Sequence, residues 1–449
     1  MQISRSNLQS FSHARPAMLS GEDTPRRFLE RCLAEIDARE PEVQAFVTLD
    51  PEGARRAADA ATVRYRAGRP LSAIDGLALG VKDIIETHDL PTQAGSPIYS
   101  GWQPVRDAAC IESLREAGAV LIGKTATTEF AIGGPGPTRN PHDPRHTPGG
   151  SSSGSAAAVG AGMIPAALGT QTQSSVLRPA SFCGCYGFKP TLGLVSTAGV
   201  HPLSSTHDHV GIVGGGLEDI WALFRVMVGC SSNPARQRLP EWFEPVAPVS
   251  LLVPGGVAWA EADEVTRSCF DVAVDKLANA GVHIIRSGED LALASLFDEF
   301  DAAISDSLDI IAFEMLWPYV SYRRTRPQAL HPRIPELIDR GLEIGPEGYR
   351  RMLEKREDLR RRIAALSPRI DGFVSLAASG PAPDGLEVLG SRTFPSYWTY
   401  LGYPSLSLPL LHIRGLPLGL QIMGFPDGDL ALFKMACYIH SMVQHPSRS

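Results

Sequence analysis

Two short runs of glycine and hydroxyl residues contain the residue types that acyl transfer requires. The first run, Gly149–Ser155, is followed by a compact apolar segment, Ala156–Leu168, and the second ends at Ser175, 24 positions after Ser151. Main-chain amides beside a reactive hydroxyl can stabilise the oxyanion that forms when the hydroxyl attacks a carbonyl carbon. The two runs therefore indicate acyl transfer through a serine, provided that the fold brings them together.

A single lysine upstream has the surroundings of a base. Lys82 follows the apolar, strand-like run Ala78–Val81, and burial there would lower the pKa of its ammonium group. A neutral lysine can accept a proton. The adjacent Asp83 need not neutralise it, because consecutive side chains of a strand point to opposite faces.

Together these features resemble the amidase signature family of serine hydrolases, which use a lysine, a serine preceded by a cis peptide, and a nucleophilic serine. The resemblance implies that Lys82 is the base, Ser151 the bridging cis-serine and Ser175 the nucleophile. It covers nearly the whole chain. The other matching segments are Asp75-Gly76, Gly123–Thr125, Glu129-Phe130, Cys183–Pro190, Gly402–Pro409 and Gly415–Gln421.

The residues around the expected nucleophile depart from the family pattern. The resemblance implies an oxyanion hole built from the main-chain N–H groups of Thr172, Gln173, Ser174 and Ser175. The family usually has two glycines before the nucleophile, and this chain has Gln173 and Ser174 instead. Because glycine permits conformations that other residues resist, the turn is either strained or uses ordinary dihedral angles. Ser174 is also the rival nucleophile.

The other serines of the first run have structural interpretations. Ser152, Ser153 and Ser155 are expected to hold main-chain amides or to cap the helix that follows. Ser151 itself could be a turn serine that bonds its own backbone. The partner serine downstream favours the bridging role.

Alternating helices and strands with glycine stops predict an α/β fold. We expect a mixed, largely parallel central sheet covered by helices on both faces, in a single large domain over 1–449. The segments that carry this prediction are a helix at Ala108–Ala117, strands at Ala119–Ile122, Val249–Val253 and Val282–Ile285, and a helix at Glu264–Ala280 with apolar positions 265, 269, 272, 273 and 277.

Three regions are expected within this domain. Residues 1–65 form an N-terminal helical arm, with a helix start at Asp23–Pro25 and an apolar stripe at Leu29, Cys32, Leu33 and Ile36. Residues 66–215 form the catalytic core. Residues 291–364 form a variable helical region that could roof the substrate cleft. Its aromatic residues, Phe313, Trp317, Tyr319 and Tyr322, fit either plain core or a pocket wall.

The composition limits the kinds of partner and the cellular compartment that the protein is expected to have. The 449 residues carry a formal net charge of −7, which argues against nucleic acid, and the basic run Arg360–Arg362 is interpreted as a solvated helix end. Seven cysteines without a spaced framework favour a reducing compartment, and Cys183 and Cys185 are expected to be buried rather than metal ligands. We expect a cytoplasmic protein with no cofactor, metal or membrane association, and the resemblance suggests a homodimer.

Two motifs point to other chemistry and are set aside. Gly118–Thr125 fits a phosphate-loop pattern, but its central residues read as a buried strand instead of an exposed loop. His207–His209 contains His-Asp-His without a Gly-x-Ser-x-Gly elbow, so a pair of loop histidines is expected rather than a triad.

The leading interpretation is a cofactor-independent hydrolase that cleaves the C–N bond of a small carboxamide through an acyl-enzyme. Three alternatives stay open. The same triad could hydrolyse carbamates, anilides or aryl esters. The chain could be the glutamine-hydrolysing subunit of a transfer-RNA amidotransferase. The altered residues around the nucleophile, Gln171, Gln173 and Ser174, argue against this alternative. It could also be a binding protein on an inactive amidase fold.

Overall fold

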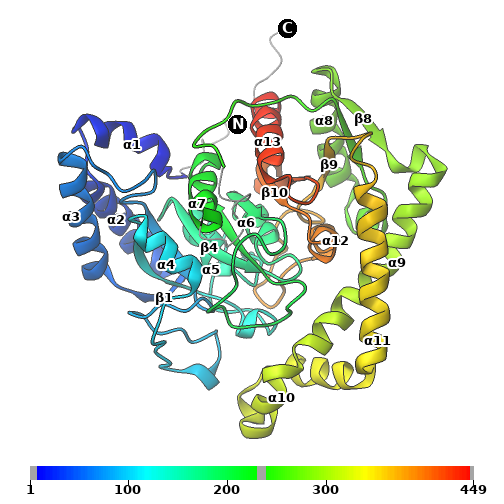
Figure 1. Cartoon of the computed structure of the whole chain (residues 1–449), viewed down its shortest axis with the longest axis horizontal. Coiled ribbons are helices and arrows are strands. Elements are labelled where there is room, and N and C mark those ends of the chain that lie inside the picture. Colours follow the sequence, from blue (N-terminus) through cyan, green and yellow to red (C-terminus); the bar gives the residue numbers. More distant parts are fainter. Residues whose placement is uncertain (1–7, 230–238, 445–449) are drawn as a thin grey trace.

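The computed structural model describes residues 8–229 and 239–444, which fold around one sheet of 11 strands (Figure 1). The strand order is β1-β3-β2-β4-β6-β5-β10-β11-β9-β7-β8. The strands are β1 Phe46–Leu49, β2 Ala78–Lys82, β3 Val120–Thr125, β4 Ala166–Gln171, β5 Tyr186–Lys189, β6 His209–Gly214, β7 Ser250–Val253, β8 His283–Arg286, β9 Gly372–Leu376, β10 Ser405–Ile413 and β11 Leu416–Met423.

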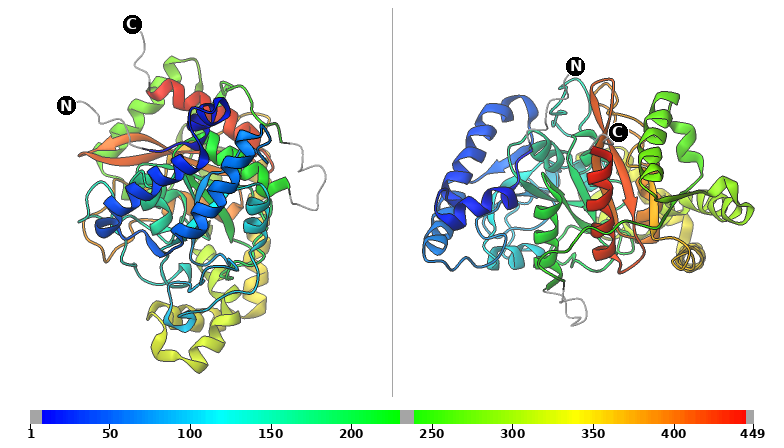
Figure 2. Two further views of the ribbon diagram at one scale, coloured as in Figure 1. Left: turned by 90° about the vertical axis from the view of Figure 1, so that its left-hand side faces the viewer. Right: turned by 90° about the horizontal axis from the view of Figure 1, so that it is seen from above.

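Parallel and antiparallel pairs occupy different parts of this sheet. Strand β2 runs parallel to both β3 and β4, and β7 runs parallel to both β8 and β9. The strands between these two groups pair antiparallel, and β1 adds an antiparallel edge. Helices lie on either side of the sheet (Figure 2). The predicted single α/β domain with a mixed sheet is confirmed.

The helices begin where the sequence supplies caps. Helix α2 starts at Pro25, and the Thr24 side chain accepts a hydrogen bond from the Arg27 N–H, as the helix-start signal predicted. Its apolar stripe is buried. The helices are α1 Phe11–Ser20, α2 Pro25–Val43, α3 Pro51–Arg66, α4 Ala109–Glu116, α5 Ser153–Gly160, α6 Leu177–Phe182, α7 Leu217–Gly229, α8 Glu264–Asn279, α9 Leu291–Glu314, α10 Leu316–Thr325, α11 Arg333–Ala364, α12 Thr393–Leu401 and α13 Asp429–Gln444. The arm expected to be helical also contains strand β1.

The β7–α8–β8 unit lies where the sequence predicted it, within two residues at each end. The predicted apolar stripe of its helix is confirmed in part. Ala273 and Leu277 are buried, whereas Val265 and Val272 are 50% and 59% exposed. Thr266 and Phe270 belong to the buried face in their place. The bulk of Phe270 sets the helix rotation, because its burial outweighs that of a valine.

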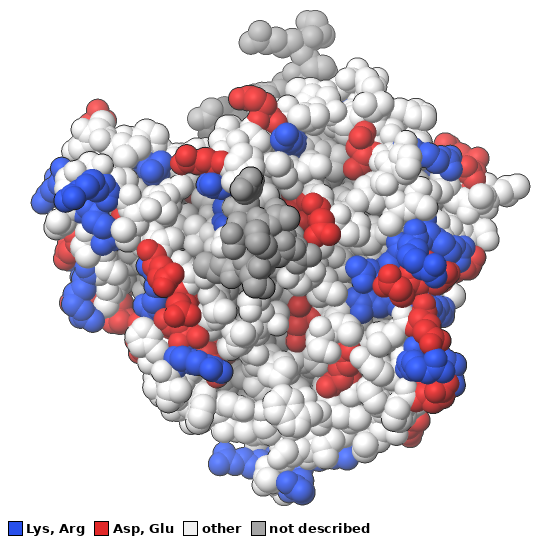
Figure 3. Space-filling view, viewed as in Figure 1, with Lys and Arg blue, Asp and Glu red and all other residues white. Residues whose placement is uncertain are grey.

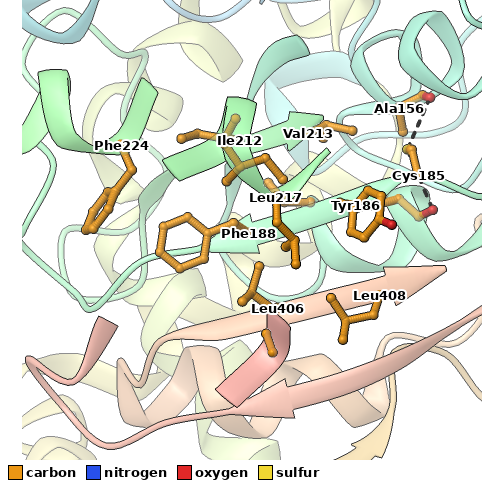
Figure 4. Packing of buried hydrophobic residues seen from close by; sticks show 14 of the residues in the cluster. Ala156, Cys185, Tyr186, Phe188, Ile212, Val213, Leu217, Phe224, Leu406 and Leu408 are labelled. Atoms are coloured by element: carbon orange, nitrogen blue, oxygen red, sulfur yellow. Dashed lines mark hydrogen bonds between the residues drawn. The ribbon is translucent and has the colours of Figure 1, made fainter. Parts of the chain in front are cut away.

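The centre of the sheet carries the main core (Figure 4). Phe188 of β5 and Ile212 of β6 lie close to Leu406 and Leu408 of β10, and all four side chains are fully buried. Removing each such side chain from water contributes roughly 1.5–3 kcal/mol to folding. Strand β6 of this core pairs with β4, which carries part of the candidate site, so the packing supports that strand.

Helices α9, α10 and α11 extend away from the sheet (Figure 1). Tyr319 and Tyr322 of α10 pack with Phe130 and His201 of the core in a second buried cluster. The aromatic stripe of this region therefore serves as core where it meets the sheet domain. Phe313 instead stacks on Tyr349 of α11, and the Trp317 side chain is exposed.

Charges on the face shown in Figure 3 alternate in sign rather than gathering into one basic surface. At the C-terminal end of α11 the arginines pair with nearby carboxylates. Arg361 pairs with Asp358 at 3.0 Å, and Arg362 pairs with Glu299 of α9 at 2.6 Å. The basic run at the end of this helix is thus a set of surface ion pairs.

Candidate active site

The site forms where parallel strands β2 and β4 end at the same edge of the sheet. Lys82 is the last residue of β2, and Thr170 lies near the end of β4. The Lys82 Nζ donates hydrogen bonds to Ser151 Oγ at 2.8 Å and to Thr170 Oγ1 at 2.7 Å. Ligands of α/β proteins commonly bind at the carboxyl ends of such strands. Thr170 was not among the residues predicted from the sequence.

Lys82 is fully buried among hydroxyl groups. Burial holds the pKa of its ammonium group well below the value of free lysine, and the charge of Asp208 opposes this shift. Asp83 turns away and pairs with Lys124 at 3.3 Å. The expectation that Asp83 need not neutralise Lys82 is confirmed by this geometry.

Ser151 follows a non-proline cis peptide bond, Gly150–Ser151. Gly149 has a φ of 75°, a left-handed conformation that favours glycine. The Ser151 side chain is 2% exposed and is directed to Lys82, which differs from a turn serine bonded to its own backbone. The chain before α5 thus presents this hydroxyl to the lysine.

The neighbouring serines do not cap helix α5, contrary to one of the two expectations. Ser152 Oγ donates to Thr170 O and accepts from Thr170 N, each at 3.2 Å. Ser155 Oγ donates to Leu168 O at 2.8 Å. The start of α5 is buried, so these hydroxyls satisfy main-chain groups of β4 instead of the helix's own N–H groups. They bind the first serine run to the strand that leads to the second.

Ser175 lies in the loop between β4 and α6. Gln171 fixes this loop, because its Oε1 accepts the N–H groups of Val176 at 2.8 Å and Leu177 at 3.0 Å. Its Nε2 donates to Thr399 Oγ1 of α12 at 2.9 Å. Gln171 therefore positions the expected nucleophile. In the sequence, Gln171 stood out only as a departure from a relative's pattern.

Both candidate nucleophiles reach one cavity of about 940 Å³. Ser175 is 9% exposed and Ser174 is 1% exposed. Ser151 lines the same cavity, whereas Lys82 lies behind it. Among the described residues, no hydrogen bond joins Ser151 to Ser175. Hydrogen bonds of this kind often tighten only when substrate binds.

The expected oxyanion loop uses ordinary dihedral angles. Gln173 and Ser174 are not among the residues with positive φ, so the missing glycines leave no strain of that kind in the turn. The Thr172 hydroxyl donates to Asp208 at 2.6 Å, and Thr399 Oγ1 donates to Gln173 O at 2.6 Å. The loop is therefore held from both sides by contacts that leave its N–H groups uninvolved.

Replacing Gln173 or Ser174 with glycine should change substrate preference more than the maximal rate. Both side chains line the cavity, while the carbonyl contacts that hold the loop do not depend on side-chain identity. We expect kcat for a small activated ester to change by less than about tenfold, whereas loss of an oxyanion donor costs about 10²–10³-fold. Steady-state kinetics on p-nitrophenyl esters measure this. A drop of the larger size in both folded variants would contradict it.

Asp208 should tune the proton affinity of Lys82. Burial raises the pKa of Asp208 to about 6, so it is an anion above that pH, and its charge favours protonated Lys82. Asp208→Asn removes the charge but keeps an acceptor for Thr172. We expect the alkaline rise of the pH–rate profile to move to lower pH. Asp219→Asn, at a buried carboxylate that bonds Ser12, is the matched control. An unmoved or raised midpoint in the Asp208 variant would contradict the assignment.

The far wall of the cavity comes from later parts of the chain. It includes Glu261, His331 and Arg333, together with residues of the segment 379–393. His331 and Arg333 belong to the region predicted as a roof, whereas its aromatic residues are absent from the lining. The His331 N–H donates to Glu129 Oε2 at 2.7 Å, which ties this wall to the core.

The motifs set aside in the sequence take structural roles. Lys124 of the phosphate-loop pattern lies on buried strand β3 and donates to Thr92 Oγ1 at 2.5 Å. His207 and His209 are buried, and His209 begins strand β6, so the expectation of loop histidines was wrong for His209. His209 lies within 3.3 Å of Lys189 Nζ. Neither histidine bonds a serine of the cavity.

Cys183 and Cys185 are buried and free, as expected. Within the described residues, one group could hold a metal ion, His88, Asp89 and Asp107 at the surface, where Arg115 already pairs with both carboxylates. No helix in residues 8–229 and 239–444 combines the length and apolarity needed to cross a bilayer.

Solved structures of amidases share this fold. A crystal structure of an amidase matches with a TM-score of 0.85 and 28% identity, over 97% of this chain and 100% of that one. The peptide amidase PAM, bound to the competitive inhibitor chymostatin, matches with a TM-score of 0.77 and 25% identity over 96% and 97% of the two chains. The fold is thus that of an amidase-type hydrolase.

The profile of the Amidase family matches residues 27–433, and the chain belongs to the amidase signature family. Among its curated relatives, the A subunit of glutamyl-tRNA(Gln) amidotransferase from Chloroflexus aggregans is 33% identical over 464 residues, covering 94% of each chain. The corresponding protein of Myxococcus xanthus is 32% identical, covering 93% of this chain and 94% of its own. Family membership and the amidase structures support hydrolysis of a C–N bond.

Proposed function

We propose that the protein hydrolyses a small carboxamide with Ser175 as nucleophile, Ser151 as bridge and Lys82 as neutral base. The observation that carries this proposal is the 2.8 Å hydrogen bond from buried Lys82 to Ser151, which shares one cavity with Ser175. The adjacent carboxylate of Asp83 does not pair with the lysine, because it faces Lys124.

In the first half-reaction, Ser175 Oγ bonds to the carbonyl carbon while its proton moves to Ser151 Oγ. Ser151 passes its own proton to Lys82 Nζ. The carbonyl electron pair moves to oxygen, where the main-chain N–H groups of Thr172, Gln173, Ser174 and Ser175 stabilise it. The C–N bond then breaks, the leaving nitrogen takes back a proton through Ser151, and an acyl-Ser175 ester stays on the enzyme.

Water resolves the ester in the second half-reaction. Lys82, through Ser151, accepts a proton from the water as its oxygen attacks the acyl carbon. The bond to Ser175 Oγ breaks, the serine recovers its proton, and the carboxylic acid leaves. No cofactor enters either half-reaction. The same steps apply to a carbamate, an anilide or an aryl ester.

A substrate panel tests the proposal. Aliphatic and aryl amides, anilides, carbamates and p-nitrophenyl esters are assayed with the wild type and Ser175→Ala in parallel. We expect Ser175-dependent release of amine or ammonia. Hydrolysis confined to esters or carbamates would show that the protein is an ester or carbamate hydrolase and does not cleave amides. Absence of all turnover and of labelling by a fluorophosphonate would favour an inactive binding protein.

A second candidate is a glutamine-hydrolysing component of an amidotransferase. The names of the protein's relatives favour this function, since eight of them are amidotransferase A subunits that match over most of their length. The replacement of the usual glycines by Gln173 and Ser174 argues against an amidotransferase. Co-purification of partner subunits together with glutamine-dependent ammonia release would establish it. A homodimer and a cytoplasmic location stay predictions.

A further inference from the structure

Three arginine side chains line the cavity that holds Ser175. Arg178 belongs to α6, Arg333 is the first residue of α11, and Arg392 immediately precedes α12. They come from segments far apart in the sequence, so no run of basic residues signals them. Their convergence on one cavity is a property of the fold.

None of the three guanidinium groups has an ion-pair partner among residues 8–229 and 239–444. Arg178 is buried and donates to Gly390 O at 2.7 Å and to Gly150 O at 2.6 Å, which leaves its Nε without a partner. Burial and the charges of Arg392 and Arg333 lower the pKa of Arg178 to about 9. The three cations therefore repel one another across a partly desolvated space.

Two carboxylates line the same cavity, and neither cancels this charge. Glu261 accepts hydrogen bonds from the hydroxyls of Thr393, at 2.7 Å, and Ser391. Its charge favours protonated Arg392, but burial and the charges of Arg333 and Arg340 outweigh it, and the pKa of Arg392 is lowered. Glu387 is exposed, and no described residue pairs with it.

The helix positions add to the positive field. Arg333 and Arg392 lie at the N-terminal ends of α11 and α12, where the helix already carries partial positive charge and where cations are disfavoured. Glu336, in the first turn of α11, partly offsets this for Arg333, yet burial still lowers the pKa of that arginine. An arginine at such a helix end lowers the stability of the free protein. A bound anion would relieve that cost.

We propose that the substrate carries a carboxylate and that Arg333 and Arg392 bind it. This rests on the proposed amide hydrolysis at Ser175 and names its substrate class. Arg178, which bonds Gly150 O next to Ser151, is a positioning residue that links the anionic subsite to the reacting serines. The carboxylate could lie on the acyl side or on the amine side of the scissile bond.

The test compares matched amides. On the acyl side, the monoamide of a dicarboxylic acid is compared with an uncharged alkyl amide of equal length. On the amine side, an N-acyl amino acid is compared with its decarboxylated analogue. The proteins are wild type, Arg333→Gln, Arg392→Gln and a control, Arg362→Gln. Arg362 lies at the other end of α11 and pairs with Glu299 of α9.

We expect the wild type to prefer one of the charged amides. Each cavity variant should lower kcat/KM for that amide by roughly ten- to a hundredfold, mainly through KM, as expected for loss of a charge-assisted hydrogen bond. The ratio of charged to uncharged activity should fall in these variants and stay constant in Arg362→Gln. Preference for the uncharged member of both pairs, or equal losses on both members, would overturn the inference.

Binding separates this inference from the proposed reaction. Calorimetry with Ser175→Ala measures the affinity of the dicarboxylic monoamide and the N-acyl amino acid without turnover. At least one should bind, more weakly at higher salt and about tenfold more weakly after loss of Arg333 or Arg392. If no amide is hydrolysed but this binding holds, the proposed reaction fails and the anionic subsite stands. If hydrolysis of uncharged amides holds and neither anion binds, the subsite alone fails.

Discussion

Ser175→Ala should abolish turnover of every substrate while the fold stays intact. Without its hydroxyl no acyl-enzyme forms, and loss of a catalytic nucleophile lowers kcat on the order of 10⁴- to 10⁶-fold. The side chain bonds no described residue, and the loop is held by Gln171, so the change leaves its supports in place. Steady-state rates with amide and ester substrates, together with circular dichroism, provide the measurement.

Ser174→Ala is the matched control for this experiment. Both serines line the cavity, but only Ser175 keeps the 24-residue separation from Ser151, and Ser174 is the more deeply buried. We expect the Ser174 variant to keep its activity within about tenfold, because alanine retains the main-chain N–H. Loss of a donor in the oxyanion hole would lower kcat by more than that. The reverse pattern, with Ser174→Ala inactive and Ser175→Ala active, would show that the nucleophile had been misassigned.

Lys82→Ala should reduce amide hydrolysis far more than hydrolysis of an activated ester. An amine leaves only after it receives a proton through Lys82 and Ser151, while p-nitrophenolate leaves unaided. We expect a loss on the order of 10²–10⁴-fold for the amide and a smaller one for the ester. Lys82→Met fills the buried space with an apolar chain and separates catalytic loss from a packing defect. Equal losses on both substrates would remove Lys82 from the mechanism.

The pH dependence of the wild type gives an independent measurement of the same lysine. Burial lowers the pKa of Lys82, so the ammonium form predominates only below that lowered pKa and cannot accept a proton there. Activity should therefore rise with pH, through a midpoint below the pKa of free lysine. At acid pH the enzyme should lose activity before it unfolds, which near-ultraviolet circular dichroism checks. A flat pH–rate profile would contradict the assignment.

The residues predicted from the sequence were those whose roles depend on local pattern. Lys82 followed an apolar strand run, and the separation of Ser151 and Ser175 matched that of the family that the chain resembles, so none of the three required knowledge of the tertiary fold. The start of α2 could likewise be located, because Thr24 and Pro25 act within one turn. The structure places Lys82, Ser151 and Ser175 at one edge of the sheet, and their catalytic roles await the tests above.

The residues that sequence reasoning missed depend on contacts across the fold. Thr170 reaches Lys82 because β2 and β4 are adjacent in the sheet, although 88 residues separate them in the chain. Asp208 meets Thr172 from the loop before β6. Arg392 reaches the cavity from the far end of the chain. Local periodicity carries no information on such neighbours, and in α8 it assigned two exposed valines, Val265 and Val272, to the buried face.

The two-sided origin of the cavity has an evolutionary consequence. One side comes from residues 128–182, whose strands and serine hydrogen bonds are fixed by the sheet, and the other from Glu261, His331, Arg333 and the segment 379–393. Selection can therefore replace side chains on the second side without disturbing the bonds of Lys82. Gene duplicates of such a chain can diverge toward new metabolites while inheriting their reaction chemistry intact.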